Sequence, residues 1–212
     1  MTFEARDGVK LSGRLFGSGP VAVVFSHMGR AGDTRADWTP VARALADREH
    51  LALVYNRRGV CSGSRDTCSG GTDDYAASWR DVAGAVDYAR EQGAEAVVLV
   101  GASIGAMSSL YAATRSDVAV EGLIEVGGIN HASGYDFTRE EVARVEGPKL
   151  FVSSAGDVYG GADSAREWYR WATPPKRLVI LSGDEHGTDL LRQGRQRRRL
   201  ISLIVNFVER VG

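Results

Sequence analysis

The chain has 212 residues, a length typical of one α/β domain, and 43% of them are hydrophobic while 25% are charged. These fractions exclude a disordered chain and a disulfide-dense mini-protein. The formal net charge is -1, and the only basic run lies between Arg195 and Arg199. We therefore expect a single domain over 1–212 that binds no nucleic acid.

The sequence offers no membrane-spanning segment, because no apolar stretch approaches the roughly 18 residues that a span needs. The first residues, Met1 to Asp7, carry acids where a signal peptide has its apolar run. These features predict a cytoplasmic chain. An extracellular location would fit a chain from which a signal peptide has been removed.

The N-terminal residues predict a β-hairpin, with strands over 2–6 and 10–16 around Asp7-Gly8, a dipeptide favoured in tight turns. The apolar run 21–25 then predicts a strand that is buried on both faces. Further strands are expected at 51–55, 96–100, 123–126, 149–153 and 178–181, and helices at 38–47, 74–90, 106–114, 163–171 and 188–211. This alternation favours a mostly parallel sheet with helices on both faces. The segment 127–148 is expected to be a short irregular insertion near a cleft.

A candidate nucleophile lies between the strand 96–100 and the helix 106–114, where 101–105 match the pattern G-x-S-x-G. In this context Ser103 would sit in a strained turn at the carboxyl edge of the sheet, and Gly101 and Gly105 would keep its surroundings small. The Ile104 N–H at the helix N-terminus would then donate to a developing oxyanion. The alternative is an ordinary Gly-Ser-Gly turn without catalytic function.

A serine needs a base, and the chain has four histidines. His186 follows the strand 178–181 and therefore lies at the carboxyl edge, as does Ser103, which makes it the candidate base. His131 lies in the insertion and is a candidate cleft residue. For the acid, Asp157 follows the strand 149–153, so the order is serine, aspartate, histidine. Asp184 and Glu185 are rivals, but residues one or two positions before the histidine can rarely turn back to its ring.

With these residues the chain resembles the α/β-hydrolase superfamily over nearly its whole length, and within it the esterase and dienelactone-hydrolase-like branch. The resemblance implies an α/β-hydrolase fold with a minimal lid. The family carries His-Gly-x after its third strand, where the chain has His27-Met28-Gly29. By resemblance, Gly29 is the register-matched second oxyanion donor, Met28 is the alternative, and His27 near the cleft supports the loop.

A second family pattern, Asp-x-Arg-Gly-x-Gly-x-Ser, resembles the segment 56–63. Asn56 replaces the acid, and Cys61 replaces a glycine, which implies a changed loop. Cys61 and Cys68 enclose six residues, a spacing that could close a small disulfide but lacks the partners of a zinc site. Two free thiols in a surface loop are the equally weighted alternative.

These observations predict a carboxylesterase-like serine hydrolase that acts on a small-molecule ester through an acyl-Ser103 intermediate, without metal ion or other cofactor. The polar insertion offers little apolar roof, which favours small or short-chain esters. Thioesters and amides would pass through the same intermediate and stay open as substrates. A non-catalytic ligand-binding protein on the same fold is the alternative from another class.

Overall fold

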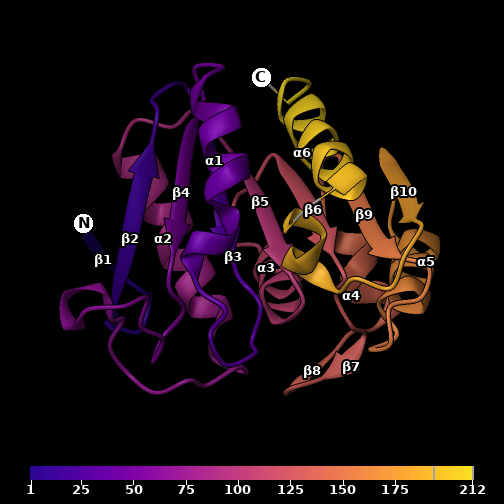
Figure 1. Ribbon diagram of the computed structural model, residues 1–212, viewed down its shortest axis with the longest axis horizontal. Coiled ribbons are helices and arrows are strands. Elements are labelled where there is room, and N and C mark those ends of the chain that lie inside the picture. The colour runs from indigo at the N-terminus through magenta and orange to yellow at the C-terminus, as the bar shows by residue number, and fades with distance from the viewer. Residues whose placement is uncertain (193, 212) are drawn as a thin grey trace.

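A computed structural model describes residues 1–192 and 194–211, and its centre is one eight-stranded sheet (Figure 1). The strands are β1 (Thr2–Glu4), β2 (Lys10–Phe16), β3 (Val21–Ser26), β4 (Leu51–Tyr55), β5 (Ala96–Ala102), β6 (Gly122–Val126), β9 (Lys149–Ser154) and β10 (Lys176–Leu181). Their spatial order is β1-β2-β4-β3-β5-β6-β9-β10. The pairs β1–β2 and β2–β4 are antiparallel, and all other pairs in this sheet are parallel. The predicted hairpin and the predicted mostly parallel sheet are confirmed.

Helices cover both faces of the sheet. They are α1 (Thr39–Ala46), α2 (Trp79–Glu91), α3 (Ile104–Ala113), α4 (Arg139–Arg144), α5 (Gly161–Trp171) and α6 (Gly194–Val208). Helices α1 and α6 lie on one face, and α2, α3 and α5 lie on the other (Figure 1). The apolar side chains of each group belong to a separate core cluster with the strands. Every residue of β3, β4, β6 and β9 is consequently buried, which explains why these strands carry long apolar runs.

Three short 3-10 helices complete the secondary structure: η1 (Arg35–Trp38), η2 (Arg65–Thr67) and η3 (Gly187–Leu191). The predicted C-terminal helix 188–211 is in fact η3 followed by α6. Residue 193 of that predicted helix, and residue 212 of the predicted domain, lie outside the described residues. None of the described helices is long and apolar enough to cross a membrane.

The segment 127–148 is more regular than the sequence predicted. It contains a small antiparallel hairpin, β7 (His131–Ala132) with β8 (Tyr135–Asp136), and then α4. Ser133 and Gly134 turn the hairpin with φ angles of 55° and 85°, the positive values that a two-residue turn needs. Thr138 caps α4, because its hydroxyl accepts from the Glu141 N–H and the Glu141 carboxylate accepts in return from the Thr138 N–H.

Candidate active site

Three side chains from separate strand ends meet at the carboxyl edge of the sheet. Ser103 follows β5, Asp157 follows β9, and His186 follows β10. His186 Nε2 lies 2.8 Å from Ser103 Oγ, and His186 Nδ1 lies 2.8 Å from Asp157 Oδ2. The structure therefore brings together the three residues that the strand-end argument selected.

The backbone at Ser103 is strained, with φ 54° and ψ −119°. Two glycines make this sharp turn possible. A Cβ on Gly101 would lie 2.2 Å from the Gly105 carbonyl oxygen, and a Cβ on Gly105 would lie 2.3 Å from that of Ser26. Because a side chain fits at neither position, α3 can approach β3 and β5 closely and present Ser103 at its N-terminus. Strain of this kind persists where the surroundings hold it in place, and it is common at functional sites.

Hydrogen bonds fix the orientation of His186. The Asp157 carboxylate can only accept, so Nδ1 carries the proton and Nε2 is free to accept from the Ser103 hydroxyl. Asp157 is itself held by the Tyr159 backbone N–H at 3.0 Å from Oδ1 and by the Ser153 hydroxyl at 3.3 Å from Oδ2. Both the histidine and the aspartate are buried. Asp184 is exposed and makes no such bond.

The loop after β3 contributes backbone rather than side chains. His27 is completely buried, its Nδ1 bonds the Met28 carbonyl at 2.7 Å, and its Nε2 accepts from the Arg57 backbone N–H at 3.1 Å. Burial, reinforced by the Arg57 charge, lowers the pKa of His27 to about 3, so the ring is neutral. The Met28 side chain is also buried, and its sulfur accepts from the Thr188 N–H at 3.2 Å.

Neither candidate cleft histidine lies in the cavity beside the triad, within the part of the chain that the structure describes. His27 is enclosed by the loop that it supports. His131 is exposed on the β7–β8 hairpin and pairs there with Asp136. Neither histidine therefore lines this cavity, and their proximity to the cleft stays a prediction.

A cavity of about 610 Å³ opens beside His186. Its lining residues are Arg30, Val158, Tyr159, Asp184, Glu185, His186, Asp189 and Arg192. Val158 and Tyr159 are 84% and 52% exposed, and the Tyr159 ring centre lies 4.5 Å from that of His186. No pattern in the sequence singled out this pair, although both residues directly follow the predicted acid Asp157.

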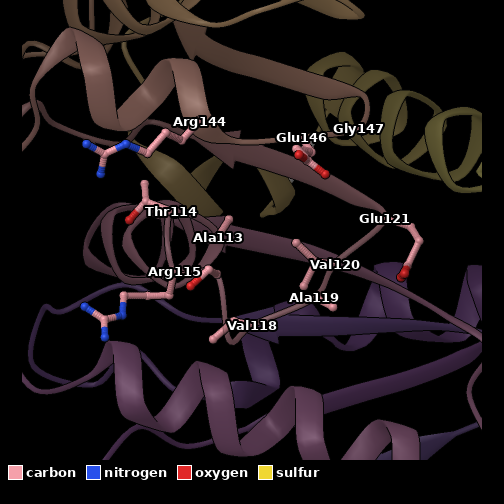
Figure 2. Close-up of a pocket in the computed structure, with 11 residues that line it drawn as sticks. Ala113, Thr114, Arg115, Val118, Ala119, Val120, Glu121, Arg144, Glu146 and Gly147 are labelled. Atoms are coloured by element: carbon pink, nitrogen blue, oxygen red, sulfur yellow. The ribbon is translucent and has the colours of Figure 1, made fainter.

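A larger cavity, of about 710 Å³, lies at the opposite edge of the sheet and contains none of the three residues (Figure 2). It is formed by the C-terminal end of α3, the segment before β6 and the end of α4, including Arg115, Glu121 and Arg144. Cavity size alone would therefore have pointed away from the Ser-His-Asp arrangement.

The loop 56–68 departs from the family pattern at Asn56 and Cys61, and in the structure each of these side chains has a partner within the loop. Asn56 Nδ2 donates to the Ser62 hydroxyl at 3.0 Å and to the Thr67 carbonyl at 2.8 Å, which an aspartate could not do. Cys61 and Cys68 are joined by a disulfide. Across the described residues, no group of three or more His, Cys, Asp or Glu side chains is arranged to hold a metal ion.

Comparisons with known proteins agree with this architecture. No curated protein sequence matches the chain. An esterase from Exiguobacterium antarcticum has a TM-score of 0.76 at 15% identity, with 99% of both chains covered. An esterase from Thermogutta terrifontis has a TM-score of 0.78 at 14% identity, with 100% of this chain and 98% of that chain covered.

An enol-lactonase from Burkholderia xenovorans LB400 is similar to the same extent, with a TM-score of 0.76 at 15% identity and 98% and 99% of the two chains covered. At such identities these likenesses concern the fold. The family model described as "Alpha/beta hydrolase family" matches residues 23–205, from β3 into α6. With most of its length matched by that model, the chain belongs to the alpha/beta hydrolase family.

Proposed function

We propose that the protein is a serine hydrolase that cleaves small carboxylic esters through an acyl-Ser103 intermediate. The observation that carries this proposal is the hydrogen-bonded series from Ser103 through His186 to Asp157, with both bonds at 2.8 Å. A base within hydrogen-bond reach of a serine, itself oriented by a carboxylate, is the arrangement that activates a hydroxyl.

In the proposed reaction, His186 Nε2 takes the proton of Ser103 as Oγ attacks the ester carbonyl carbon. The resulting imidazolium is stabilised by Asp157 and then protonates the departing alkoxide. A water molecule, deprotonated by the same nitrogen, attacks the acyl-enzyme and releases the acid. The tetrahedral oxyanion of each step would lie at the N-terminus of α3, where the Ile104 N–H and a second N–H from Met28 or Gly29 donate to it.

The proposed preference for short acyl groups rests on where the apolar residues of 127–148 lie. Tyr135, Phe137, Val142 and Val145 are all 5% exposed or less and belong to the core beneath α2, α3 and α5. They are therefore not free to form a roof over an acyl chain. Val158 and Tyr159 supply a small apolar surface at the cavity beside His186.

The named structural neighbours are compatible with this substrate class, since two are named as esterases and one as an enol-lactonase, and a lactone is a cyclic ester. Thioesters and amides would use the same three residues. The hydrogen bonds from Ser103 through His186 to Asp157 favour a catalytic function over simple ligand binding, because a binding site does not require a serine hydroxyl paired with an oriented base.

Hydrolysis of p-nitrophenyl acetate and labelling by a fluorophosphonate test the proposal. We expect Ser103→Ala to lower the turnover number by at least about 10³-fold and to abolish labelling, since only binding and oxyanion effects would be left. Ser109→Ala is the matched control, because it removes a buried hydroxyl without a hydrogen-bond partner from the same helix. Labelling of the Ser103→Ala variant, or retention of most of its activity, would contradict the assignment.

A further inference from the structure

The peptide group between Met28 and Gly29 is held from one side only. Its carbonyl oxygen, that of Met28, lies 2.7 Å from His27 Nδ1 and accepts from an Arg57 guanidinium N–H at 3.3 Å. The N–H of this peptide belongs to Gly29. In a trans peptide the N–H points opposite to the carbonyl, so the Gly29 N–H is directed away from Arg57 and His27.

The next peptide group is held at both ends. The Gly29 carbonyl accepts from the Tyr75 hydroxyl at 2.6 Å, and the Arg30 N–H donates to Asp33 Oδ2 at 3.0 Å. Of the four hydrogen-bonding groups of these two peptides, the Gly29 N–H is the one without an acceptor among the described residues. A free, fixed donor is what an oxyanion site requires.

Gly29 also lies next to the first residue of α3. A Cβ built on Gly29 would be 3.1 Å from Ile104 Cγ2 and 3.0 Å from the Tyr75 hydroxyl.

The Met28 N–H, which is the alternative donor, has the opposite orientation. The Met28 N–H shares its peptide with the His27 carbonyl, whose oxygen faces α3, at 2.7 Å from a Cβ built on Gly105. The Met28 N–H therefore points away from the helix N-terminus.

We propose that Arg57 and Tyr75 are positioning residues: by holding the carbonyls of Met28 and Gly29, they aim the Gly29 N–H, which the family resemblance implies as the second oxyanion donor. The inference rests on the proposed function.

Arg57 and Tyr75 contact each other as well as the loop 27–29. The Arg57 side chain is 1% exposed, and its guanidinium forms an ion pair with Asp73 at 2.5 Å. The same guanidinium lies over the Tyr75 ring, 5.0 Å from the ring centre. Arg57 Nε is buried without a hydrogen-bond partner among the described residues. A buried unsatisfied donor costs free energy, so this arrangement is not the one that stability alone would favour.

The Tyr75→Phe variant tests the hydroxyl while it keeps the ring beneath Arg57. We expect the turnover number for p-nitrophenyl acetate to fall about tenfold with KM within about twofold, a smaller loss than the 10²- to 10³-fold that removal of an oxyanion donor costs. The inhibition constant of a trifluoromethyl ketone, whose serine adduct carries an oxyanion, should rise by the same factor. Tyr88→Phe is the matched control, because Tyr88 is a half-buried tyrosine that stacks on Phe3 far from this loop.

The Arg57→Lys variant tests the guanidinium, which a lysine cannot replace at both Met28 and Asp73. Arg58→Lys is its control: Arg58 is also buried and pairs with Asp81 and Asp7, but it makes no bond to the loop 27–29. Both variants should lower the midpoint of thermal unfolding. Only Arg57→Lys should lower the turnover number of the folded enzyme, by at least tenfold, and weaken the ketone in parallel.

The outcomes separate this inference from the proposed function. Unchanged turnover in Tyr75→Phe and Arg57→Lys, an effect on KM alone, or an equal loss in Arg58→Lys would overturn the positioning assignment while Ser103-dependent hydrolysis stands. If the unmodified protein shows no hydrolysis that depends on Ser103, the proposed function and this inference fail together.

Discussion

At the scale of single residues, both carboxylate oxygens of Asp157 have hydrogen-bond partners, and one of these partners is His186 Nδ1. We expect Asp157→Asn to lower the turnover number by about 10³- to 10⁴-fold with the fold intact, because an amide in place of the carboxylate favours the wrong tautomer of His186. Initial rates with p-nitrophenyl acetate, together with a circular dichroism spectrum, measure both effects. Asp184→Asn is the control and should leave the rate nearly unchanged, since Asp184 makes no bond to the ring. The reverse pattern would move the acid to Asp184.

Glu125 on β6 is a buried carboxyl that the proposed reaction does not use. It is 1% exposed, and neither of its oxygens has a hydrogen-bond partner among the described residues. Burial raises its pKa well above the ordinary value. The folded protein therefore keeps this proton at a pH at which the unfolded chain has lost it, so the residue destabilises the fold progressively as pH rises above about 4.3.

Glu125→Gln should remove this pH dependence. We expect the free energy of unfolding in urea to be similar in both proteins near pH 4.5 and higher in the variant at pH 8. The gain at pH 8 should exceed the roughly 0.5 kcal/mol of an ordinary surface substitution. A difference between the two proteins that stays constant from pH 4.5 to pH 8 would contradict the argument.

At the scale of elements, strands were predicted better than helix starts. The central strands are buried on both faces, so their apolar runs mark their positions directly. Helix α2 begins at Trp79 rather than near Asp74 because side chains form a turn first: Asp74 Oδ1 accepts from the Ala77 N–H, and the Ser78 hydroxyl donates to the Tyr75 carbonyl. Periodicity of apolar residues does not detect such local hydrogen bonds.

The candidate site also contains residues that could be predicted from the sequence and contacts that could not. Ser103, Asp157 and His186 could be predicted because each follows a recognisable strand, and parallel strands bring their carboxyl ends to one edge. The bonds from Arg57 and Tyr75 to the loop 27–29 could not be predicted, because they join loops far apart in the chain and depend on the direction of individual carbonyls. The family pattern around Arg57 was the available signal, but it does not state a contact.

The burial of the segment 127–148 predicts a chain-length preference. Each additional methylene contributes about 0.8 kcal/mol only where an apolar wall receives it, and the apolar side chains of this segment face the core. We expect kcat/KM for p-nitrophenyl esters to be highest from acetyl to butyryl and to fall by octanoyl. A steady rise to dodecanoyl, or activation at a lipid interface, would show that a roof exists. The Ser103→Ala variant provides the background rate for each ester.

At the scale of the whole molecule, acid sensitivity follows from the buried His27. Its pKa is about 3 in the folded protein, against about 6.5 in the unfolded chain. Below pH 6.5 the unfolded chain binds a proton that the folded protein refuses, so this residue costs about 1.4 kcal/mol of stability per pH unit down to about pH 3. We expect the His27 imidazole signals in an NMR titration to stay constant between pH 8 and 4.5. Protonation in that range without unfolding would contradict this expectation.

The Met28 side chain lies between the loop after β3 and the segment at the start of η3, and it contacts both. Its sulfur accepts from the Thr188 N–H, and a Cβ on Gly187 would lie only 2.3 Å from that sulfur, so the contact leaves no free space. On one side lies the loop that would stabilise negative charge, and on the other lies the segment that carries His186, the proposed base. We therefore expect a substitution that displaces η3 to displace the loop after β3 as well, so that the proposed base and the proposed oxyanion donors are not altered independently.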